Sequence, residues 1–376
     1  MIIGTVREIK SQEDRVGLAP ESVGELTARG HTVLVEAGAG TGIDAADEAY
    51  LAAGAEIRDS ASAVFDEVEL IVKVKEPQPQ ERAMLRDGQV LFTYLHLAPD
   101  PEQTRDLMQS GATCIAYETV TDDTGGLPLL KPMSQVAGRL SAQAGATALQ
   151  KVHGGRGVLL GGVPGVMPAK VTILGGGVVG FHAAQMAVGL GAEVTIVDRS
   201  PAVLERLATH FENRAHTSFA SQATVERLVA QSDLVIGAVL IPGASAPKMV
   251  TREMLGTMQK GAVLVDVAID QGGCFETSRA TSHADPTYIV DDIVHYCVAN
   301  MPGGVARTST FALNAVTLPH VINIAERGWE EALRADRHLR RGLNVWRGEI
   351  TCEPVAKELG ESWTSPEKVL SLGEGA

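Results

Sequence analysis

The sequence predicts an α/β fold made of two Rossmann-like, doubly wound domains with a cleft between them, and three observations support this prediction. The chain has 376 residues, more than a single hydrophobic core usually serves. Its composition, 45% hydrophobic with 40 glycines and 4% aromatic residues, suits helices packed on parallel strands. Short apolar runs also alternate with helical segments along most of the chain, as in the βα repeat of a parallel sheet.

The first third of the chain repeats strand and helix signals in turn. Apolar runs indicate the strands, and the more polar stretches between them indicate the helices. We expect strands within residues 2–6, 32–38, 69–77, 90–98 and 113–120, helices within 20–30, 80–88 and 100–111, and a further repeat within 48–57. Glycine and proline residues in 121–134 then interrupt the pattern, which predicts a domain boundary near this segment.

A second set of repeats follows a helical segment and a glycine-rich loop at 154–169. We expect its strands within 170–177, 192–198, 232–240, 261–269 and 287–294, with helices between them. From residue 307 the pattern is helical, and the C-terminal segment is too short to bury a core of its own. We expect this segment to pack on the N-terminal domain, so that the domains are residues 1–128 plus 305–376 and residues 129–304.

Composition also excludes several classes of partner. A net charge of −14 leaves no basic stripe for nucleic acid or for an anionic membrane, so a small ligand is expected. Cys114, Cys274, Cys297 and Cys352 lie far apart without metal-binding spacing, which indicates reduced thiols and no metal site. The N-terminus does not resemble a signal peptide, and no run of about 18 apolar residues could span a membrane. We therefore expect a cytoplasmic protein.

The strongest local motif lies in VTILGGGVVGFHAAQMAVGLGAEVTIVD. Gly175, Gly177 and Gly180 form G-x-G-x-x-G between a predicted strand and a predicted helix, and Asp198 ends the next strand. In this setting the first glycine allows a tight turn, the second lets a pyrophosphate approach the helix N-terminus, and the third allows close helix–strand packing. Asp198 can accept hydrogen bonds from the ribose hydroxyls and would repel a 2′-phosphate. This favours NAD over NADP, although Arg199 beside it leaves NADP open.

A dinucleotide-binding domain indicates hydride transfer but leaves the substrate open. Four stretches of the N-terminal domain carry unusual polar residues: Arg15 in REIKSQEDRVGLAP, Lys73 and Lys75 in LIVKVKEP, His96 in LFTYLHLAP, and Glu118 in AYETV. In the last three stretches these residues lie at or near the carboxyl end of an apolar run, the edge at which doubly wound sheets bind ligands. Taken singly, such residues are more often ordinary surface or core residues. Their convergence on one edge indicates a substrate site.

These motifs resemble those of the bacterial alanine dehydrogenases and, more loosely, of the NAD-binding part of proton-translocating transhydrogenase. The resemblance covers essentially the whole chain and rests on REIKSQEDRVGLAP, KVKEP, YLHLAP, LPLLKPMSQVAGR, GGVPGVMPAKVTILGGGVVG, VDVAIDQGG and VANMPGGVARTST. The histidine of YLHLAP and the lack of a C-terminal membrane segment favour the dehydrogenases. The resemblance implies NAD as the cofactor and the reversible oxidative deamination of L-alanine to pyruvate and ammonium.

The same resemblance assigns roles to four chemical residues. It implies that Arg15 and Lys75 hold the substrate and that His96 and Asp270 are catalytic. A guanidinium can bind a carboxylate through two hydrogen bonds, and a lysine can neutralise it. A histidine titrates near neutral pH, so it can exchange a proton with the substrate oxygen. Asp270 is expected at a strand end, facing the substrate across the cleft and stabilising the ammonium or imine cation.

Further pocket residues also follow from the resemblance. Tyr94 and Asn300 are expected to line the substrate pocket. Besides the glycine motif and Asp198, the cofactor set comprises Ser134, Val178, Val179, Val239, Leu240, Val267, Ile269, Arg279, Val298 and Met301. The chain departs from the family pattern at Asp14, where asparagine is usual, and near Arg7, Val203 and Ala220, where proline, a basic residue and serine are usual. The last two departures concern the adenosine contacts and leave the four chemical residues intact.

Two alternatives stay open at the level of the sequence. The first is a dehydrogenase for another small 2-oxo acid such as glyoxylate, because one methylene is worth only about 1–3 kcal/mol of discrimination. The second is a non-catalytic nucleotide-binding subunit of a transhydrogenase-like complex. The resemblance also implies a homo-oligomer, a hexamer. The residues do not determine the physiological direction of the reaction.

Overall fold

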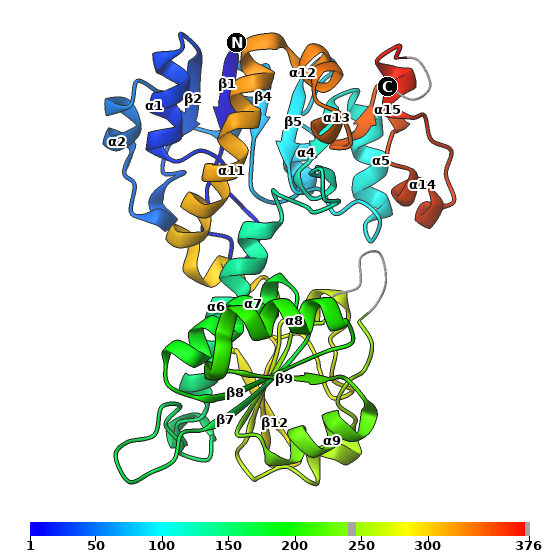
Figure 1. Ribbon diagram of the computed structural model, residues 1–376. Coiled ribbons are helices and arrows are strands. Elements are labelled where there is room, and N and C mark those ends of the chain that lie inside the picture. The colour runs from blue at the N-terminus through cyan, green and yellow to red at the C-terminus, as the bar shows by residue number, and fades with distance from the viewer. Residues whose placement is uncertain (240–245, 373–376) are drawn as a thin grey trace. The chain divides into compact units, whose positions relative to one another are not determined.

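The computed structural model describes residues 1–239 and 246–372. It divides into two compact units, one formed by Met1–Pro132 with Val305–Ala376 and the other by Met133–Gly304 (Figure 1). Each unit is built on one sheet of mostly parallel strands, so the predicted α/β class is confirmed. None of the helices in the described ranges is long and apolar enough to cross a membrane.

The sheet of the first unit has eight strands in the order β15-β14-β6-β5-β4-β1-β2-β3. Their bounds are β1 Ile2–Thr5, β2 Thr32–Glu36, β3 Glu56–Arg58, β4 Leu70–Val72, β5 Val90–Thr93, β6 Thr113–Ala116, β14 Leu343–Trp346 and β15 Glu349–Ile350. Strands β1 to β6 are parallel, and the chain order reverses between β1 and β4. In a doubly wound sheet this reversal is the point at which ligands bind, beyond the carboxyl ends of the strands.

The helices of the first unit are α1 Pro20–Ala28, η1 Thr41–Ile43, α2 Asp47–Ala52, α3 Ala61–Glu67, α4 Pro79–Arg82, α5 Pro101–Ser110, η2 Tyr117–Thr119, α11 Ala306–Arg327, α12 Trp329–Ala335, α13 Arg337–Arg340, α14 Glu353–Leu359 and α15 Pro366–Val369. Local sequence explains their ends. In α5, the side chain of Asp100 accepts a hydrogen bond from the Gln103 amide at 2.9 Å, Pro101 occupies the first turn, and Gly111 ends the helix in the left-handed region.

The sheet of the second unit has the order β12-β13-β11-β10-β7-β8-β9. Its strands are β7 Lys170–Leu174, β8 Glu193–Asp198, β9 His216–Phe219, β10 Leu234–Gly237, β11 Val263–Asp266, β12 Thr287–Val290 and β13 Ile293–Tyr296. Its helices are α7 Val178–Gly189, α8 Pro201–Phe211, η4 Glu212–Arg214, α9 Gln222–Gln231, α10 Arg252–Leu255 and η5 Ile269–Gln271, with η3 Lys151–His153 before β7. Helix α6, Lys131–Ala148, begins in the first unit, and η6, Met301–Val305, ends at the return to it.

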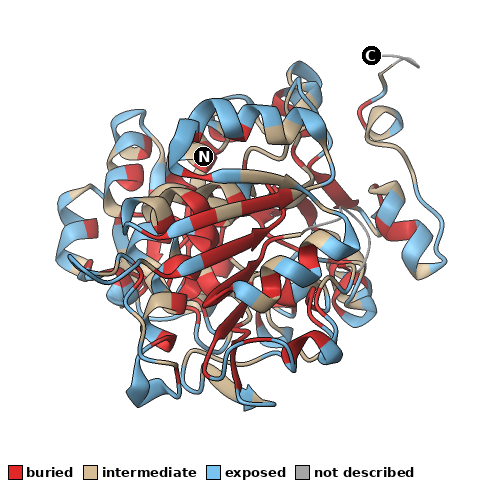
Figure 2. Cartoon of the chain, turned by 60° about the horizontal axis from the view of Figure 1, so that its bottom comes forward, coloured by how far each residue is buried: buried red, intermediate tan, exposed pale blue. Residues whose placement is uncertain are grey.

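Burial follows the layers. The central strands β4, β5, β6, β10 and β11 are buried at every residue, which is why they read as continuous apolar runs rather than as alternating patterns. Figure 2 shows buried strands beneath helices whose outer faces are exposed. Leu91, Cys114 and Val345 belong to the core of the first unit, and Ile173, Ala183 and Ile236 to that of the second.

Three segments differ from the sequence prediction. Residues 287–294 form not one strand but the start of an antiparallel hairpin, because Asp291 and Asp292 both adopt positive φ and turn the chain between β12 and β13. The C-terminal region is not wholly helical, since β14 pairs antiparallel with β6 and extends the first sheet. The helix expected within 80–88 is only the four residues of α4.

Candidate functional site

The loop after β1 carries Arg15, and contacts with other elements fix its path. Val16 forms a bridge with Arg7, and Asn314 of α11 accepts the Ala19 amide at 2.8 Å and donates to the Gly17 carbonyl at 3.1 Å. These contacts join segments almost 300 residues apart in the sequence, so α11 positions the loop. Sequence reasoning missed Asn314, although a buried polar residue in an otherwise apolar helix segment is a signal for such a role.

Arg15 is almost completely buried, with 2% of its surface exposed. Its Nε and Nη2 each lie 2.5 Å from an oxygen of Glu13, which forms a two-point ion pair within the same loop. Burial by itself would lower the pKa of Arg15, but the hydrogen bonds and charge of Glu13 raise it, so the guanidinium stays charged. Glu13 therefore fixes the orientation of Arg15, the residue predicted to bind the substrate. The sequence prediction did not include this role for Glu13.

The two lysines after β4 have different environments. Lys73 is fully buried, and its Nζ lies 3.1 Å from a carboxylate oxygen of Glu8 and 2.7 Å from one of Glu81. The three side chains form a buried ion triad with a structural role, so Lys73 is not available to bind substrate. Lys75 is half-buried, and its ammonium makes no hydrogen bond or ion pair with the residues that the structure describes. Burial lowers the pKa of Lys75; the charge of Glu76 opposes this shift and that of Arg15 adds to it. Lys75 is thus a cation in need of an anion.

His96 lies in the loop after β5 with 43% of its side chain exposed and its backbone in the left-handed region, at φ +51°. Glu118, after β6, accepts the amide of His96 at 2.6 Å and that of Leu95 at 3.1 Å, which stabilises this uncommon conformation. The ring stacks on Tyr94 with centroids 5.8 Å apart, and the Tyr94 phenol donates to the Leu129 carbonyl at 2.7 Å.

The first unit therefore brings Arg15, Lys75, Tyr94 and His96 together at the carboxyl edge of its sheet. The ring contact joins Tyr94 to His96, and the charges of Arg15 and Lys75 act on one another across the same site. Glu76 joins the group, because its carboxylate lies 3.6 Å from the imidazole Nδ1 of His96. The sequence analysis did not single out Glu76, although it directly follows Lys75.

The glycine motif of the second unit has the geometry that a dinucleotide turn requires. Gly175 has φ +102°, which only glycine adopts readily. A Cβ on Gly180 would lie 1.8 Å from the Gly175 carbonyl oxygen, so any side chain there would collide with the turn. A Cβ on Gly177, just before the 12-residue helix α7, would meet nothing within 4 Å, so this face is open for a phosphate group. The residues present thus fit the group that the motif implies.

Asp198 lies beside this turn, at the end of β8. Its two oxygens accept the backbone amides of Gly176, at 2.7 Å, and Ser200, at 2.8 Å, which holds the carboxylate in place. Val203, where the family usually has a basic residue, packs against the turn, since a Cβ on Gly176 would meet its side chain at 2.8 Å. Ala220 contributes its amide to the Asp198 carbonyl at 3.0 Å. The side chains at positions 203 and 220 are therefore apolar, while the guanidinium of Arg206 supplies a basic group by donating to the Gly176 carbonyl at 3.1 Å.

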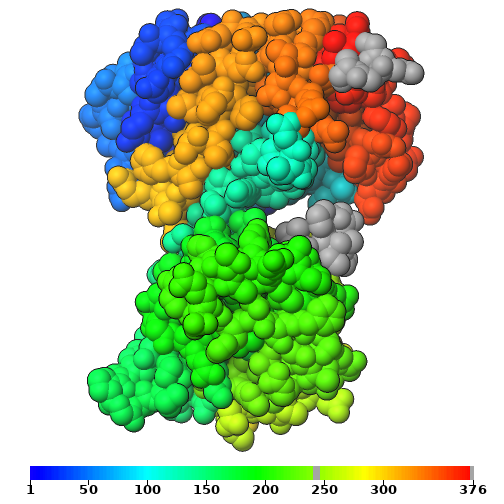
Figure 3. Space-filling model, viewed as in Figure 1, coloured from blue at the N-terminus to red at the C-terminus, as the bar shows by residue number. Residues whose placement is uncertain are grey.

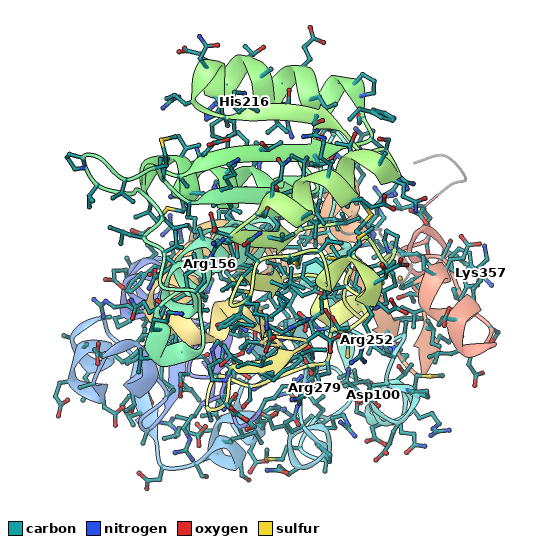
Figure 4. The ribbon with its side chains drawn as sticks, turned by 90° about the horizontal axis from the view of Figure 1, so that it is seen from below. Asp100, Arg156, His216, Arg252, Arg279 and Lys357 are labelled. Atoms are coloured by element: carbon teal, nitrogen blue, oxygen red, sulfur yellow. The ribbon has the colours of Figure 1, made fainter. Side chains whose placement is uncertain are left out.

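Most other predicted cofactor residues follow the carboxyl ends of neighbouring strands. Val239 follows β10 next to Gly175, Val267 donates its amide to the Gly237 carbonyl at 2.9 Å, and Ile269 begins η5. Val298, after β13, and Met301, in η6, are both buried. Val178 and Val179 form the start of α7, and Ser134 lies on α6. The guanidinium of Arg279, labelled in Figure 4, lies 4.0 Å from the centre of the Tyr288 ring. Leu240 lies outside the described residues.

Asp270 and Asn300 belong to the second unit, and Asp270 does not lie at a strand end as expected. Strand β11 ends at Asp266, which is buried and accepts the Cys274 amide at 2.9 Å and the Ser278 hydroxyl at 2.5 Å. Asp270 lies four residues later in η5 and is exposed, because the chain turns out of the core after the buried aspartate. Asn300 adopts φ +58°, and its carbonyl lies 3.1 Å from the Nε2 of His283.

Comparison with known proteins decides the family. Residues 4–137 match the N-terminal domain model of alanine dehydrogenase/PNT, and residues 141–353 match the C-terminal domain model. The chain belongs to the alanine dehydrogenase/PNT family. It is similar to an alanine dehydrogenase of Halomonas elongata, 57% identical over 96% of this chain and 97% of the relative. It is also similar to one of Mycolicibacterium smegmatis, 52% identical over 99% and 100%. The resemblance seen in the sequence motifs is therefore confirmed.

Solved structures of the alanine dehydrogenase/PNT family agree. An L-alanine dehydrogenase superposes with a TM-score of 0.93 at 51% identity, covering 96% of this chain and 99% of the other. A transhydrogenase of Sinorhizobium meliloti superposes with a TM-score of 0.83 at 26% identity, covering 93% and 100%. In the described ranges no group of three or more His, Cys, Asp or Glu side chains is arranged to hold a metal ion.

Proposed function

We propose that this chain is an NAD-dependent alanine dehydrogenase. It converts L-alanine, NAD⁺ and water to pyruvate, ammonium, NADH and a proton, and it catalyses the reverse reaction. Membership of the family and the names of relatives at 52–57% identity support this reaction. The observation that carries the proposal is Lys75, a half-buried ammonium without a counter-ion among the described residues, beside Arg15 and His96. A small carboxylate is the ligand that such a site requires.

Arg15 and Lys75 hold the carboxylate of the substrate in this proposal. Glu13 fixes the plane of the Arg15 guanidinium. Lys75, in a neighbouring loop, supplies a second positive charge. Two cations of different geometry suit the task, because the guanidinium orients the carboxylate and the ammonium neutralises it. Tyr94 lies beside His96 in the first unit, and we infer that Asn300 of the second unit is a further substrate residue. The phenol of Tyr94 is fixed by its bond to the Leu129 carbonyl, and its ring stacks on that of His96.

His96 exchanges a proton with the substrate oxygen. In the direction of deamination it accepts the proton of the carbinolamine hydroxyl as the C–N bond breaks, and in the direction of amination it returns that proton. Its partly exposed ring allows the proton to pass on to water. Asp270, which is exposed, stabilises the ammonium or imine cation. Bound NAD supplies the hydride acceptor for the Cα–H bond.

The second unit holds the cofactor in this proposal. Gly175, Gly177 and Gly180 form the turn that binds the pyrophosphate. Asp198 accepts hydrogen bonds from the ribose hydroxyls, because its two bonds to backbone amides leave other lone pairs of the carboxylate available. The strand-end and loop residues complete the site: Ser134, Val178, Val179, Val239, Val267, Ile269, Arg279, Val298 and Met301. Because the side chain of Asp198 occupies the position next to the turn, a 2′-phosphate is disfavoured, which supports NAD rather than NADP.

The test is consumption of NADH by the purified protein with pyruvate and ammonium. We expect oxidation of NADH that falls by roughly 10²–10⁴-fold in His96→Ala and in Asp270→Asn. His216→Ala, an exposed residue of β9, is the matched control and should keep full activity. Glyoxylate is assayed in parallel, and a higher kcat/KM for it than for pyruvate would make the chain a dehydrogenase of another 2-oxo acid. Tight NADH binding without oxidation by either acid would instead indicate a nucleotide-binding subunit.

The proposal extends to assembly and domain limits. The loop before β7, at the lower left of Figures 1 and 3, exposes more than half of each of the side chains of Leu159, Val163, Val166 and Met167. Apolar groups exposed together support a homo-oligomer, and the family resemblance implies a hexamer. Light scattering tests this by measuring the molar mass of the protein in solution. Limited proteolysis tests the predicted domain limits, residues 1–128 plus 305–376 and residues 129–304. Cell fractionation tests the predicted cytoplasmic location.

A further inference from the structure

Glu76 has no assigned role, yet its environment is unusual for a glutamate. Only 14% of its side chain is exposed, and it lies in the segment between β4 and α4. One carboxylate oxygen, Oε1, accepts a hydrogen bond and ion pair from Lys10 in the loop after β1. The other oxygen, Oε2, is buried without a hydrogen-bond partner in the described structure. A buried carboxylate oxygen that lacks a donor is costly and requires an explanation.

The imidazole of His96 lies close to this oxygen, with its Nδ1 3.6 Å from Oε2. This separation is an ion-pair distance, slightly longer than a hydrogen bond. Catalytic hydrogen bonds are often long before the substrate binds, and a small rotation of the partly exposed ring would close this one. The buried oxygen would then gain its missing donor, so closure satisfies both groups.

Other contacts fix the two partners from the opposite sides. Lys10 holds Glu76, and Glu118 holds the His96 backbone through its amide at 2.6 Å. Charged or titratable groups of the adjoining loops lie near this pair: Tyr94 stacks on the ring, the charges of Lys75 and Glu76 act on one another, and Arg15 with its partner Glu13 acts on Lys75. Among the residues that the structure describes, Glu76 is the one acid with an oxygen at ion-pair distance from a ring nitrogen of His96.

We propose that Glu76 and His96 form a carboxylate–imidazole dyad in which Glu76 accepts the Nδ1 proton of His96 and thereby directs the Nε2 atom to the substrate. Glu76 is a positioning residue here, and the dyad deepens the proposed function, on which its catalytic part rests. The anion selects one tautomer of the neutral ring and stabilises the imidazolium that forms when Nε2 takes a proton. Although burial raises the pKa of Glu76, the nearby imidazole of His96, the bond to Lys10 and the charge of Lys75 lower it to about 2, so the carboxylate remains an acceptor at neutral pH.

The first experiment does not depend on catalysis. Diethyl pyrocarbonate acylates only the unprotonated imidazole, so its reaction with His96, followed residue by residue by mass spectrometry against pH, reports the protonation of the ring in the full-length protein. In Glu76→Gln we expect the midpoint of this reaction to move to lower pH by about one unit, because an opposite charge within ion-pair distance is lost. Glu76→Asp keeps the charge and should retain most of the wild-type midpoint. Glu67→Gln, which removes a glutamate paired with Arg58 outside the site, should leave it unchanged.

The second experiment measures catalysis with the same variants. The dyad predicts that Glu76→Gln lowers kcat by roughly 10²-fold with little change in the KM for pyruvate, and that the acid limb of the kcat/KM profile moves with the labelling midpoint. A rise in KM alone, or an unchanged midpoint in a variant that unfolds at the wild-type temperature, would overturn the dyad. If the wild-type protein has no dehydrogenase activity but the labelling midpoint still shifts, the proposed function fails while the ion pair stands.

Discussion

The six parallel strands of the first unit and the six parallel strands of the second follow the same order, with the chain reversing between β1 and β4 in one and between β7 and β10 in the other. At this edge the second unit presents backbone: glycines, one aspartate held by two amides, and the start of α7. The first unit presents charged side chains at the same place, including Lys73, Lys75 and His96. One topology thus carries a phosphate cradle in one unit and a charged pocket in the other, because the residues after each strand, not the strands, determine the chemistry.

The difference also concerns what each edge tolerates. The glycine turn fails when volume is added at Gly175 or Gly180, since a Cβ there would collide with backbone atoms. The charged pocket fails when a partner is removed, since a buried charge that loses its counter-ion keeps its desolvation cost. Three substitutions test this contrast, from the largest expected effect to the smallest.

Lys73→Met tests the buried triad of the first unit. It leaves Glu8 and Glu81 buried without their cation, and we expect a loss of about 3–5 kcal/mol in the free energy of unfolding. Burial already raises the pKa of Glu8 above its ordinary 4.5. Without Lys73 the folded state retains protons that the unfolded state releases, so the stability of the variant should fall as pH rises above about that value. Urea unfolding at several pH values measures both effects.

The matched control for Lys73→Met removes the whole triad. The triple variant combines Lys73→Met with Glu8→Gln and Glu81→Gln, and it should recover most of the stability. The neutral glutamine side chains can still accept hydrogen bonds from the backbone amides of Val74 and Gln78. If Lys73→Met alone is as stable as the wild-type protein at neutral pH, the triad has no structural role.

Gly180→Val tests the cradle of the second unit. The new Cβ would meet the Gly175 carbonyl oxygen at 1.8 Å, so the turn must move, at a cost of about 1–3 kcal/mol in stability and with loss of NADH binding. Gly177→Ala is the contrasting change, because its Cβ meets nothing within 4 Å. It should leave the thermal unfolding unchanged while NADH binds about tenfold more weakly, or ~1.4 kcal/mol. Equal binding of NADH by Gly177→Ala and wild type would show that no phosphate approaches this face.

Lys75→Arg gives the smallest effect and tests whether the pocket cation titrates. Burial lowers the pKa of Lys75, so its positive charge is lost at a lower pH than for an ordinary lysine. Inhibition by oxamate, a small carboxylate, should therefore weaken with rising pH in the wild-type enzyme. This alkaline limb should move to higher pH in Lys75→Arg, because a guanidinium stays charged. Lys357→Arg, an exposed residue of α14, is the control. An unmoved limb would exclude Lys75 as the titrating group.

The sequence by itself determined the class of fold, the nucleotide turn and its neighbouring aspartate, and the residues of the charged edge. Each of these depends on local information: the period of apolar residues, the spacing of glycines between a strand and a helix, and polar residues at the ends of apolar runs. Gly175 and Gly180 are such cases, because Gly175 adopts φ +102° within the turn and the atom that excludes a side chain at Gly180 is the Gly175 carbonyl oxygen.

Only the tertiary structure decided which charges are paired and which are available. Lys73 and Lys75 are alike in sequence, yet one lies between two glutamates and the other has no described partner, because Glu8 reaches Lys73 from the loop after β1, 65 residues earlier in the chain. The same holds for Asn314 on the Arg15 loop, for β14 on β6, and for Asp266 rather than Asp270 at the end of β11. Pairing between distant segments depends on how the sheet orders its strands, which local patterns do not encode.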